Sequence, residues 1–318
     1  VIRDMLEVDE GDPFNKLLHA KSINNLKARG IFQNVSSKIV DTTDGNLKNI
    51  DITVEEKATG EILVGAGVGS EGGTAQFSVS ENNFLGKGVK LSTGLRISET
   101  RLRGNFTITN PNFNYLDKAL FTDIFVTDVD KLTDSGYEST NAGFSLGTGF
   151  EQYDDFFFRP TFSTTYEELT TNSSASANLK KQKGTYFTTE IGYTLDFDKR
   201  NQKFQTSDGF QSKFIQKIPL ISESDTLLNG YQFDTYISYD KITSSLGLYL
   251  RSVTGLSDDA RISERVTLPR KRLRGFSAGK IGPVDANDHV GGNYAASLNF
   301  QTNLPFLFPS FRSIDFNY

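Results

Sequence analysis

The sequence predicts a mainly β fold, a transmembrane antiparallel β-barrel preceded by a small α+β module. Segments of about ten residues alternate apolar and polar side chains along most of the chain, as strands do when one face meets lipid and the other water. The 318 residues include 26 Phe and 12 Tyr, which favours strands. No apolar run approaches the ~18 residues of a membrane-spanning helix, so any crossing of a bilayer must use strands.

Residues 1–57 form the predicted α+β module. Asp12 followed by Pro13 predicts the N-cap and the first position of a helix, which carries a roughly helical apolar stripe. Two strands, residues 32–40 and 47–54, are expected to follow this helix. The stripe consists of Phe14, Leu17, Leu18, Ile23 and Leu26.

From residue 58 to residue 318 we expect strand after strand, with no helix between them. The alternation is clearest in residues 89–98, 186–197, 231–240, 244–251 and 295–304. We count about twelve strands and the start of a thirteenth near Arg312, whereas a barrel in lipid must close and usually has an even number of strands. The sequence therefore predicts a barrel that is incomplete at its C-terminal end.

A soluble β-sandwich or propeller would show the same alternation. The expected strands are longer than the ~5–6 residues typical of globular sheets, and their polar faces repeatedly carry charged residues. Aromatic residues gather near strand ends, as in the run Phe156, Phe157 and Phe158. Together these features favour the barrel.

A long inserted loop is predicted at about residues 256–292, between two alternating segments. It carries the motif Leu273-Arg274-Gly275-Phe276, directly after a cationic run, and it has no hydrophobic run of its own. Loops of this length without secondary structure are uncommon in compact domains and usually have a function. The loop is therefore the first candidate for a functional site.

Composition and motifs exclude several classes of site. The net charge of -5 argues against binding to nucleic acid, and the absence of Cys removes thiolate chemistry. Gly65, Gly67 and Gly69 resemble the start of a dinucleotide-binding fingerprint, but a second strand follows them where that fingerprint requires a helix. We predict no metal site and no cofactor, because paired acidic residues have the spacing of solvated turns.

Only two histidines are present, so an enzyme is disfavoured. His19 lies on the predicted helix of the module. His289 lies close to Asp285 and Asp288 in the inserted loop, which leaves a barrel hydrolase with a Ser/His/Asp site as the alternative from another class.

The ordered combination of these features resembles the family of outer-membrane assembly factors, in which POTRA modules precede a β-barrel. The module ending at Lys57 and the glycine-rich first strand match that organisation. Leu273-Arg274-Gly275-Phe276 is similar to the family's Val-Arg-Gly-Phe/Tyr loop motif. A second similarity is to the family's aspartate-to-glycine turn before a middle strand, carried by Asp198, Arg200, Asn201, Thr206 and Gly209.

The resemblance implies a sixteen-stranded barrel, of which this chain would hold about thirteen strands and part of the last POTRA module, truncated at both ends. In this family the loop folds into the barrel, and its arginine meets acidic side chains of later strands. Arg274 would be that arginine. Asn299 stands where an acidic partner is expected, with Asp285 and Asp288 as substitutes, and Arg274→Ala is expected to weaken assembly or stability, whereas His289→Ala is not.

The function implied is that of a non-enzymatic factor that folds and inserts β-barrel proteins into the Gram-negative outer membrane. A lateral seam would open at the first strand, and its edge would template an incoming strand by β-augmentation. The expected partners are unfolded β-barrel clients, accessory lipoproteins and the lipid bilayer, with the POTRA module in the periplasm. A TamA-like or two-partner-secretion translocation barrel is the alternative. The seam residues are Ile62, Val64, Gly65, Gly67 and Gly69.

Overall fold

The computed structural model describes residues 2–8, 10–43, 47–69, 72–113, 118–223, 225–240, 242–277 and 279–303. It divides into two compact units. Unit 1 comprises Val1–Glu99 and Gly104–Asp123, and unit 2 comprises Thr100–Arg103 and Ile124–Tyr318. The thirteenth strand predicted near Arg312 lies outside the described residues.

The module at the start of unit 1 contains a 3-10 turn, one helix and two antiparallel strands. These are η1 (Arg3–Met5), α1 (Lys16–Ala28), β1 (Phe32–Asp41) and β2 (Lys48–Glu56). The prediction that Asp12 caps the helix is wrong, because α1 begins after Asn15. The Asn15 side-chain oxygen accepts hydrogen bonds from the backbone N–H groups of Leu17 and Leu18, at 2.8 and 3.3 Å. These two N–H groups lie in the first turn and have no acceptor within the helix.

The buried face of α1 is more polar than predicted. His19, Ser22 and Leu26 are buried, whereas Leu17 of the predicted stripe is 80% exposed. The His19 ring bonds through Nε2 to the Ser37 hydroxyl of β1 at 3.0 Å. Hydrogen bonding therefore lets a polar helix face pack on the small sheet.

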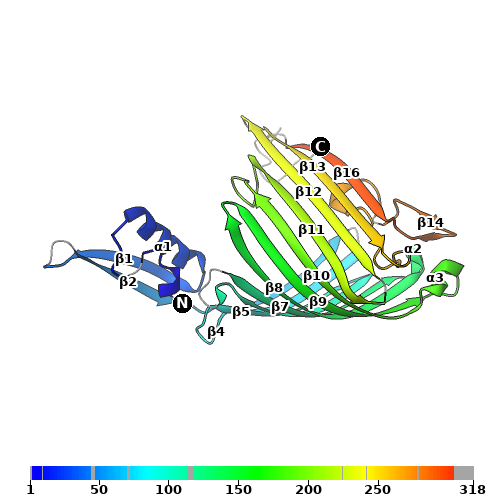
Figure 1. The fold of residues 1–318 in the computed structure, drawn as a ribbon, viewed down its shortest axis with the longest axis horizontal. Coiled ribbons are helices and arrows are strands. Elements are labelled where there is room, and N and C mark those ends of the chain that lie inside the picture. The colour runs from blue at the N-terminus through cyan, green and yellow to red at the C-terminus, as the bar shows by residue number, and fades with distance from the viewer. Residues whose placement is uncertain are drawn as a thin grey trace. The chain divides into compact units, whose positions relative to one another are not determined.

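A single sheet of twelve strands follows, and its order along the sheet is the order along the chain, from β3 to β13 and then β16 (Figure 1). This confirms the predicted mainly β antiparallel fold and the count of about twelve strands. The strands are β3 (Gly60–Gly69), β4 (Gly72–Phe84), β5 (Val89–Ser98), β6 (Arg101–Asn110), β7 (Ala119–Lys131), β8 (Tyr137–Tyr153), β9 (Phe156–Thr171), β10 (Gly184–Asp198), β11 (Gly209–Ser222), β12 (Thr226–Tyr239), β13 (Ile242–Gly255) and β16 (Tyr294–Asn303).

Short elements decorate the connections of unit 2. Helices α2 (Leu132–Ser135) and α3 (Ala177–Lys181) precede β8 and β10, so the expectation of no helix after the module is wrong there. The segment between β13 and β16 contains the 3-10 turn η3 (Arg270–Arg272) and a hairpin of β14 (Val284–Asp285) and β15 (Asp288–His289). Within the described residues, no helix is both long and apolar enough to cross a membrane.

Strand register assigns side chains of unit 2 to two faces. Asp234 of β12 lies opposite Gly247 of β13, which lies opposite Asn299 of β16, and Arg272 of the inserted loop contacts all three positions. We call this loop-covered side the inner face. The neighbours of these residues along each strand, such as Phe233, point to the outer face because successive side chains of a strand alternate.

Aromatic rings form two contact series on the outer face, with centroids 5.6 to 6.4 Å apart within each pair. Offset and edge-on ring pairs of this kind stabilise neighbouring strands beyond the area they bury. One series is Phe150, Phe158, Tyr193 and Phe214, and the other is Phe156, Phe197, Phe210 and Phe233.

Candidate functional site: the inserted loop and its anchors

Arg272, two residues before the predicted arginine, makes a close charged contact between the inserted loop and the sheet. Its guanidinium binds Asp234 in a bidentate manner, with Nη1 and Nη2 at 2.8 and 2.9 Å from the two carboxylate oxygens. The Arg272 side chain is 9% exposed and that of Asp234 25%. Hydrogen bonding to Asp234 raises the pKa of Arg272, so the guanidinium stays charged although its side chain is largely buried.

Two further residues complete this contact, which we call the Arg272 latch. Asn299 donates from Nδ2 to the backbone carbonyl of Arg272 at 2.8 Å. A Cβ built on Gly247 would lie 2.5 Å from Arg272 Nη1 and 2.6 Å from Asp234 Oδ1. Gly247 therefore leaves the space that the ion pair fills.

The predicted motif lies beside this latch and is more exposed. Arg274 donates from Nη2 to the side-chain oxygen of Gln301 at 3.2 Å, and that contact is exposed. Gly275 has φ +83°, a left-handed conformation that favours glycine and turns the chain. Phe276 is 52% exposed, and Leu273 is partly buried.

Of the three predicted contacts of Arg274, only Asn299 bonds to this part of the loop, and its partner is the backbone carbonyl of Arg272. Asp285 accepts hydrogen bonds from Ser176 Oγ at 2.7 Å and from Asn178, and Asp288 accepts from the Ser176 backbone N–H at 3.1 Å. These carboxylates anchor the loop hairpin to the start of α3. The role of Arg274 itself stays a prediction.

A second anchor holds the start of the loop through Arg261, which sequence reasoning missed. Its Nη2 lies 3.3 Å from Glu167 of β9 and 2.9 Å from Glu264, and all three side chains are at most 20% exposed. The guanidinium carbon lies 4.0 Å from the centre of the Tyr186 ring, and the loop next inserts Ile262 into the core. That core cluster consists of Tyr137, Leu169, Ala175, Leu179, Ile262 and Val290.

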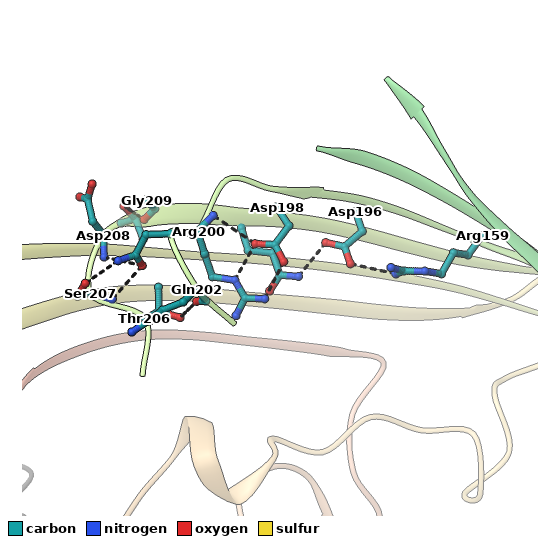
Figure 2. A network of polar contacts seen from close by, with 12 residues as sticks. Arg159, Asp196, Asp198, Arg200, Gln202, Thr206, Ser207, Asp208 and Gly209 are labelled. Carbon is teal, nitrogen blue, oxygen red and sulfur yellow. Dashed lines mark hydrogen bonds and ion pairs between the residues drawn. The ribbon is translucent and has the colours of Figure 1, made fainter. Parts of the chain in front are cut away.

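The turn between β10 and β11 is the second site that the sequence singled out (Figure 2). Arg200 turns back onto Asp198, with Nε and Nη2 each 2.7 Å from one carboxylate oxygen. Asn201 accepts from the backbone N–H groups of Ser207 and Asp208, both at 3.2 Å. Beside the turn, Arg159 of β9 lies 3.0 Å from Asp196. The motif residues therefore fix a rigid turn, and this arrangement offers no chemistry of its own.

We expect Gly209→Ala to destabilise the protein by roughly 2 kcal/mol or more, because the change adds both strain and a clash. Gly209 has φ +94°, and a Cβ there would overlap the carbonyl oxygen of Lys199, a backbone atom that cannot move aside. The midpoint of urea unfolding of the full-length protein measures the effect. Gly230→Ala is the matched control, since its nearest neighbour would lie at 3.8 Å. Equal losses in the two variants would contradict the assignment.

Strand β3 is the last strand at one end of the described sheet, and it contains the predicted seam residues. Ile62 and Val64 are 71% and 77% exposed, and Gly65, Gly67 and Gly69 lie in the same strand. Its pairing with β4 is continuous from Gly60 to Gly69. The strand therefore combines exposed apolar side chains with glycines that contribute little packing.

The residues of the hydrolase alternative do not assemble into a triad. His289 is paired with Val284 in the loop hairpin, and within the described residues no serine hydroxyl bonds to its ring and its Nδ1 has no partner. Among the same residues, no group of three or more His, Cys, Asp or Glu side chains could hold a metal ion.

Comparison with known families identifies the fold and the module. The family model described as the Omp85 superfamily domain matches residues 83–316. The chain belongs to the Omp85 superfamily. The POTRA model, described as surface antigen variable number repeat, matches residues 1–57. The Omp85 barrel and the POTRA module place the protein in the Gram-negative outer membrane with the module in the periplasm.

Individual relatives agree with this Omp85 assignment. The chain is 23% identical to the outer membrane protein assembly factor BamA of Neorickettsia risticii, over 97% of this chain and 42% of the relative. It is 22% identical to BamA of Nitratidesulfovibrio vulgaris, over 95% of this chain and 39% of the relative. The chain thus spans about two fifths of the length of these curated relatives.

Solved structures show the same fold. BamA from Haemophilus ducreyi lacking POTRA domains 1–3 superimposes with a TM-score of 0.83 at 18% identity, covering 96% of this chain and 65% of that one. CdiB from Acinetobacter baumannii gives a TM-score of 0.56 at 11% identity, covering 97% and 58%. Both superpositions show the same barrel fold, and the first has the higher TM-score.

Proposed function

We propose that this chain is part of a factor that folds β-barrel proteins and inserts them into the outer membrane. The feature that carries the proposal is strand β3, the first strand of the twelve-stranded sheet, which combines exposed apolar side chains with glycines that contribute little packing. A free strand edge presents a row of backbone N–H and C=O groups that another strand can pair with. Opening of the barrel seam at β3 would expose such an edge as a template for an incoming strand.

The insertion step would be β-augmentation at this edge. The backbone N–H and C=O groups of an unfolded client strand would form hydrogen bonds with β3 before the strand enters the bilayer. Unpaired backbone groups are costly in lipid. Gly65 and Gly67 have no side chains to pack, so the pairing partner of β3 can be exchanged more easily than that of other strands. The process requires no nucleotide and no metal.

The POTRA module would receive clients and accessory lipoproteins on the periplasmic side. Its described sheet contains β1 and β2, and an edge strand of such a sheet can pair with an extended peptide. The similarity to proteins named assembly factor BamA supports this reading. We therefore assign the unfolded barrel proteins as the clients of the whole protein.

An engineered disulfide between Val64 of β3 and the closing strand of the full-length protein is expected to stop client insertion. The cross-link would hold the seam shut, and reduction should restore insertion. Folding of a barrel client in proteoliposomes measures the effect. A disulfide between Val64 and Phe77 of β4, which lie opposite each other within the sheet, is the control and should leave insertion intact. Full insertion by the locked seam would rule out this mechanism.

Translocation of a polypeptide across the membrane is the second candidate, as in a TamA-like or two-partner-secretion barrel. It is favoured by the likeness to two CdiB structures, with TM-scores of 0.56 and 0.53. The two functions differ in where the client ends. In proteoliposomes an inserted barrel remains in the bilayer and resists extraction, whereas a translocated chain becomes protected in the lumen.

A further inference from the structure

Five polar residues form a straight row across five strands of unit 2. Tyr193 of β10 lies opposite Gln216 of β11, which lies opposite Asn229, then Ser252, then Tyr294 of β16. We call these residues the polar row. Asn229 and Ser252 alternate with inner-face residues along their strands, so the row lies on the outer face, opposite the inserted loop.

Hydrogen bonds run along this polar row from one strand to the next. The Tyr193 hydroxyl donates to Gln216 Oε1 at 2.7 Å, and Gln216 Nε2 donates to Asn229 Oδ1 at 2.6 Å. Asn229 Nδ2 donates to Ser252 Oγ at 3.5 Å, the longest of the three. The carbonyl oxygens of both amides are thus used by protein donors.

Donors remain at the far end of the row. Each side-chain amide carries two hydrogens, and the bonds above use one from Gln216 and one from Asn229. Within the described part of the chain, no acceptor is found for the second hydrogen of Asn229 or for the hydroxyl hydrogens of Ser252 and Tyr294. The unmatched groups are therefore donors, and what they require is an acceptor.

An apolar hollow of about 460 Å³ lies at these donors. Asn229 and Ser252 share its lining with apolar and aromatic side chains of β11 to β16. The apolar part of the lining consists of Phe214, Tyr231, Leu250, Tyr294, Ala295 and Ala296. The hollow thus combines an apolar wall with two hydrogen-bond donors, as binding sites for amphipathic small molecules do.

The position of the hollow indicates what occupies it. Asn229 is near the start of β12, Ser252 is near the end of β13 and Tyr294 begins β16, so the hollow lies close to the strand ends that adjoin the inserted loop. The outer face of an outer-membrane barrel meets lipid. Near strand ends, the bilayer supplies ester carbonyls at the boundary between head groups and acyl chains.

We propose that this hollow binds one diacyl phospholipid. An acyl chain lies against the aromatic and aliphatic wall, and an ester carbonyl accepts hydrogen bonds from Asn229 and Ser252. A donor facing hydrocarbon with no acceptor is costly, and the carbonyl removes that cost. The site depends on the outer-membrane location and not on the insertion mechanism, so either proposal can fail alone.

The test compares two lipids that differ only in the acceptor. Full-length protein in detergent is titrated with dioleoyl phosphatidylethanolamine or with its dialkyl ether analogue, which lacks the ester carbonyls, and retained lipid is counted by native mass spectrometry. We expect the ester lipid to bind about 3–10-fold more tightly, as one or two net hydrogen bonds would give. Equal binding of the two lipids overturns the proposal.

Variants distinguish a lipid site from hydrogen bonds that only join strands. Asn229→Leu with Ser252→Ala is expected to abolish the preference for the ester lipid. Ala296→Trp fills the hollow and should reduce binding of both lipids, which keeps the test decisive if the double variant folds poorly. Ser244→Ala is the control, since Ser244 bonds Thr302 on the same face outside the hollow and its loss should keep the preference. An ester preference that survives in the double variant, or unchanged binding of both lipids to Ala296→Trp, would refute the site.

Discussion

Gly247→Ala is expected to release the inserted loop from the sheet and to destabilise the protein by about 2–4 kcal/mol. The added methyl group would occupy the space of Arg272 Nη1 and Asp234 Oδ1, at 2.5 and 2.6 Å. The atoms it meets are the ends of side chains, so the strand can keep its pairing while the ion pair separates. The cost falls below that of a fully buried pair because the Asp234 side chain keeps 25% exposure.

Two measurements on the full-length protein check this outcome. The temperature at which the folded form is lost in detergent should fall, and trypsin should cleave the loop faster at the cationic run that includes Lys271. Asp234→Ala should have the same effect, and the double variant should cost little more than either change alone, because both remove one interaction. Additive losses would show that Gly247 acts through something other than the ion pair.

The neighbouring arginine supplies the matched control. Arg274→Ala removes one exposed hydrogen bond, to Gln301, so its effect should be within ~1 kcal/mol and trypsin cleavage should hardly change. His289→Ala should be similarly small. If Arg274→Ala instead exceeded Arg272→Ala, the latch would be centred on the predicted motif.

The sequence predicted strands well because alternation is a local property. The segment predicted at residues 89–98 is the strand β5, Val89–Ser98, and the count of about twelve strands follows from the same period. The helix start was missed because two candidate caps, Asp12 and Asn15, lie three residues apart, and only the side-chain bonds of Asn15 choose between them. Helix α3 was missed because five residues are too few to show a helical period.

The site was predicted less fully because its partners are distant in sequence. Arg272 meets Asp234, 38 residues away, and the match depends on the register of β12 with β13 and β16. A motif search directs attention to Arg274, whereas the burial that makes an arginine costly to remove falls on Arg272. The sequence offers one weak indication of this site, because Gly247 is a glycine on the polar face of an alternating strand.

Loss of the Arg261 anchor is the second large effect that we expect. Arg261→Ala would leave Glu167, whose side chain is 7% exposed, without its counter-charge inside the sheet. Breaking one partner of a buried pair costs about 3–5 kcal/mol, and the contact with the Tyr186 ring adds to the loss. The same contact positions Ile262 in the core, so the start of the loop should detach together with the arginine.

A charge-balanced variant separates the buried charge from the lost packing. Arg261→Met with Glu167→Gln removes the two most buried charges, keeps much of the volume and leaves an amide oxygen that can accept from Ser139, which now donates to Glu167 at 2.7 Å. Glu264 loses the guanidinium but keeps its bonds from the Thr226 hydroxyl and the backbone N–H of residue 261. This pair of changes should recover at least half of the stability lost in Arg261→Ala, as judged by urea unfolding. Lys280→Ala breaks the exposed pair between the loop and Asp134 and should cost less than ~1 kcal/mol. Lys280 also holds the loop by an ion pair, in its case to helix α2. A loss as small for Arg261→Ala as for Lys280→Ala would therefore mean that burial does not set the strength of the Arg261 anchor.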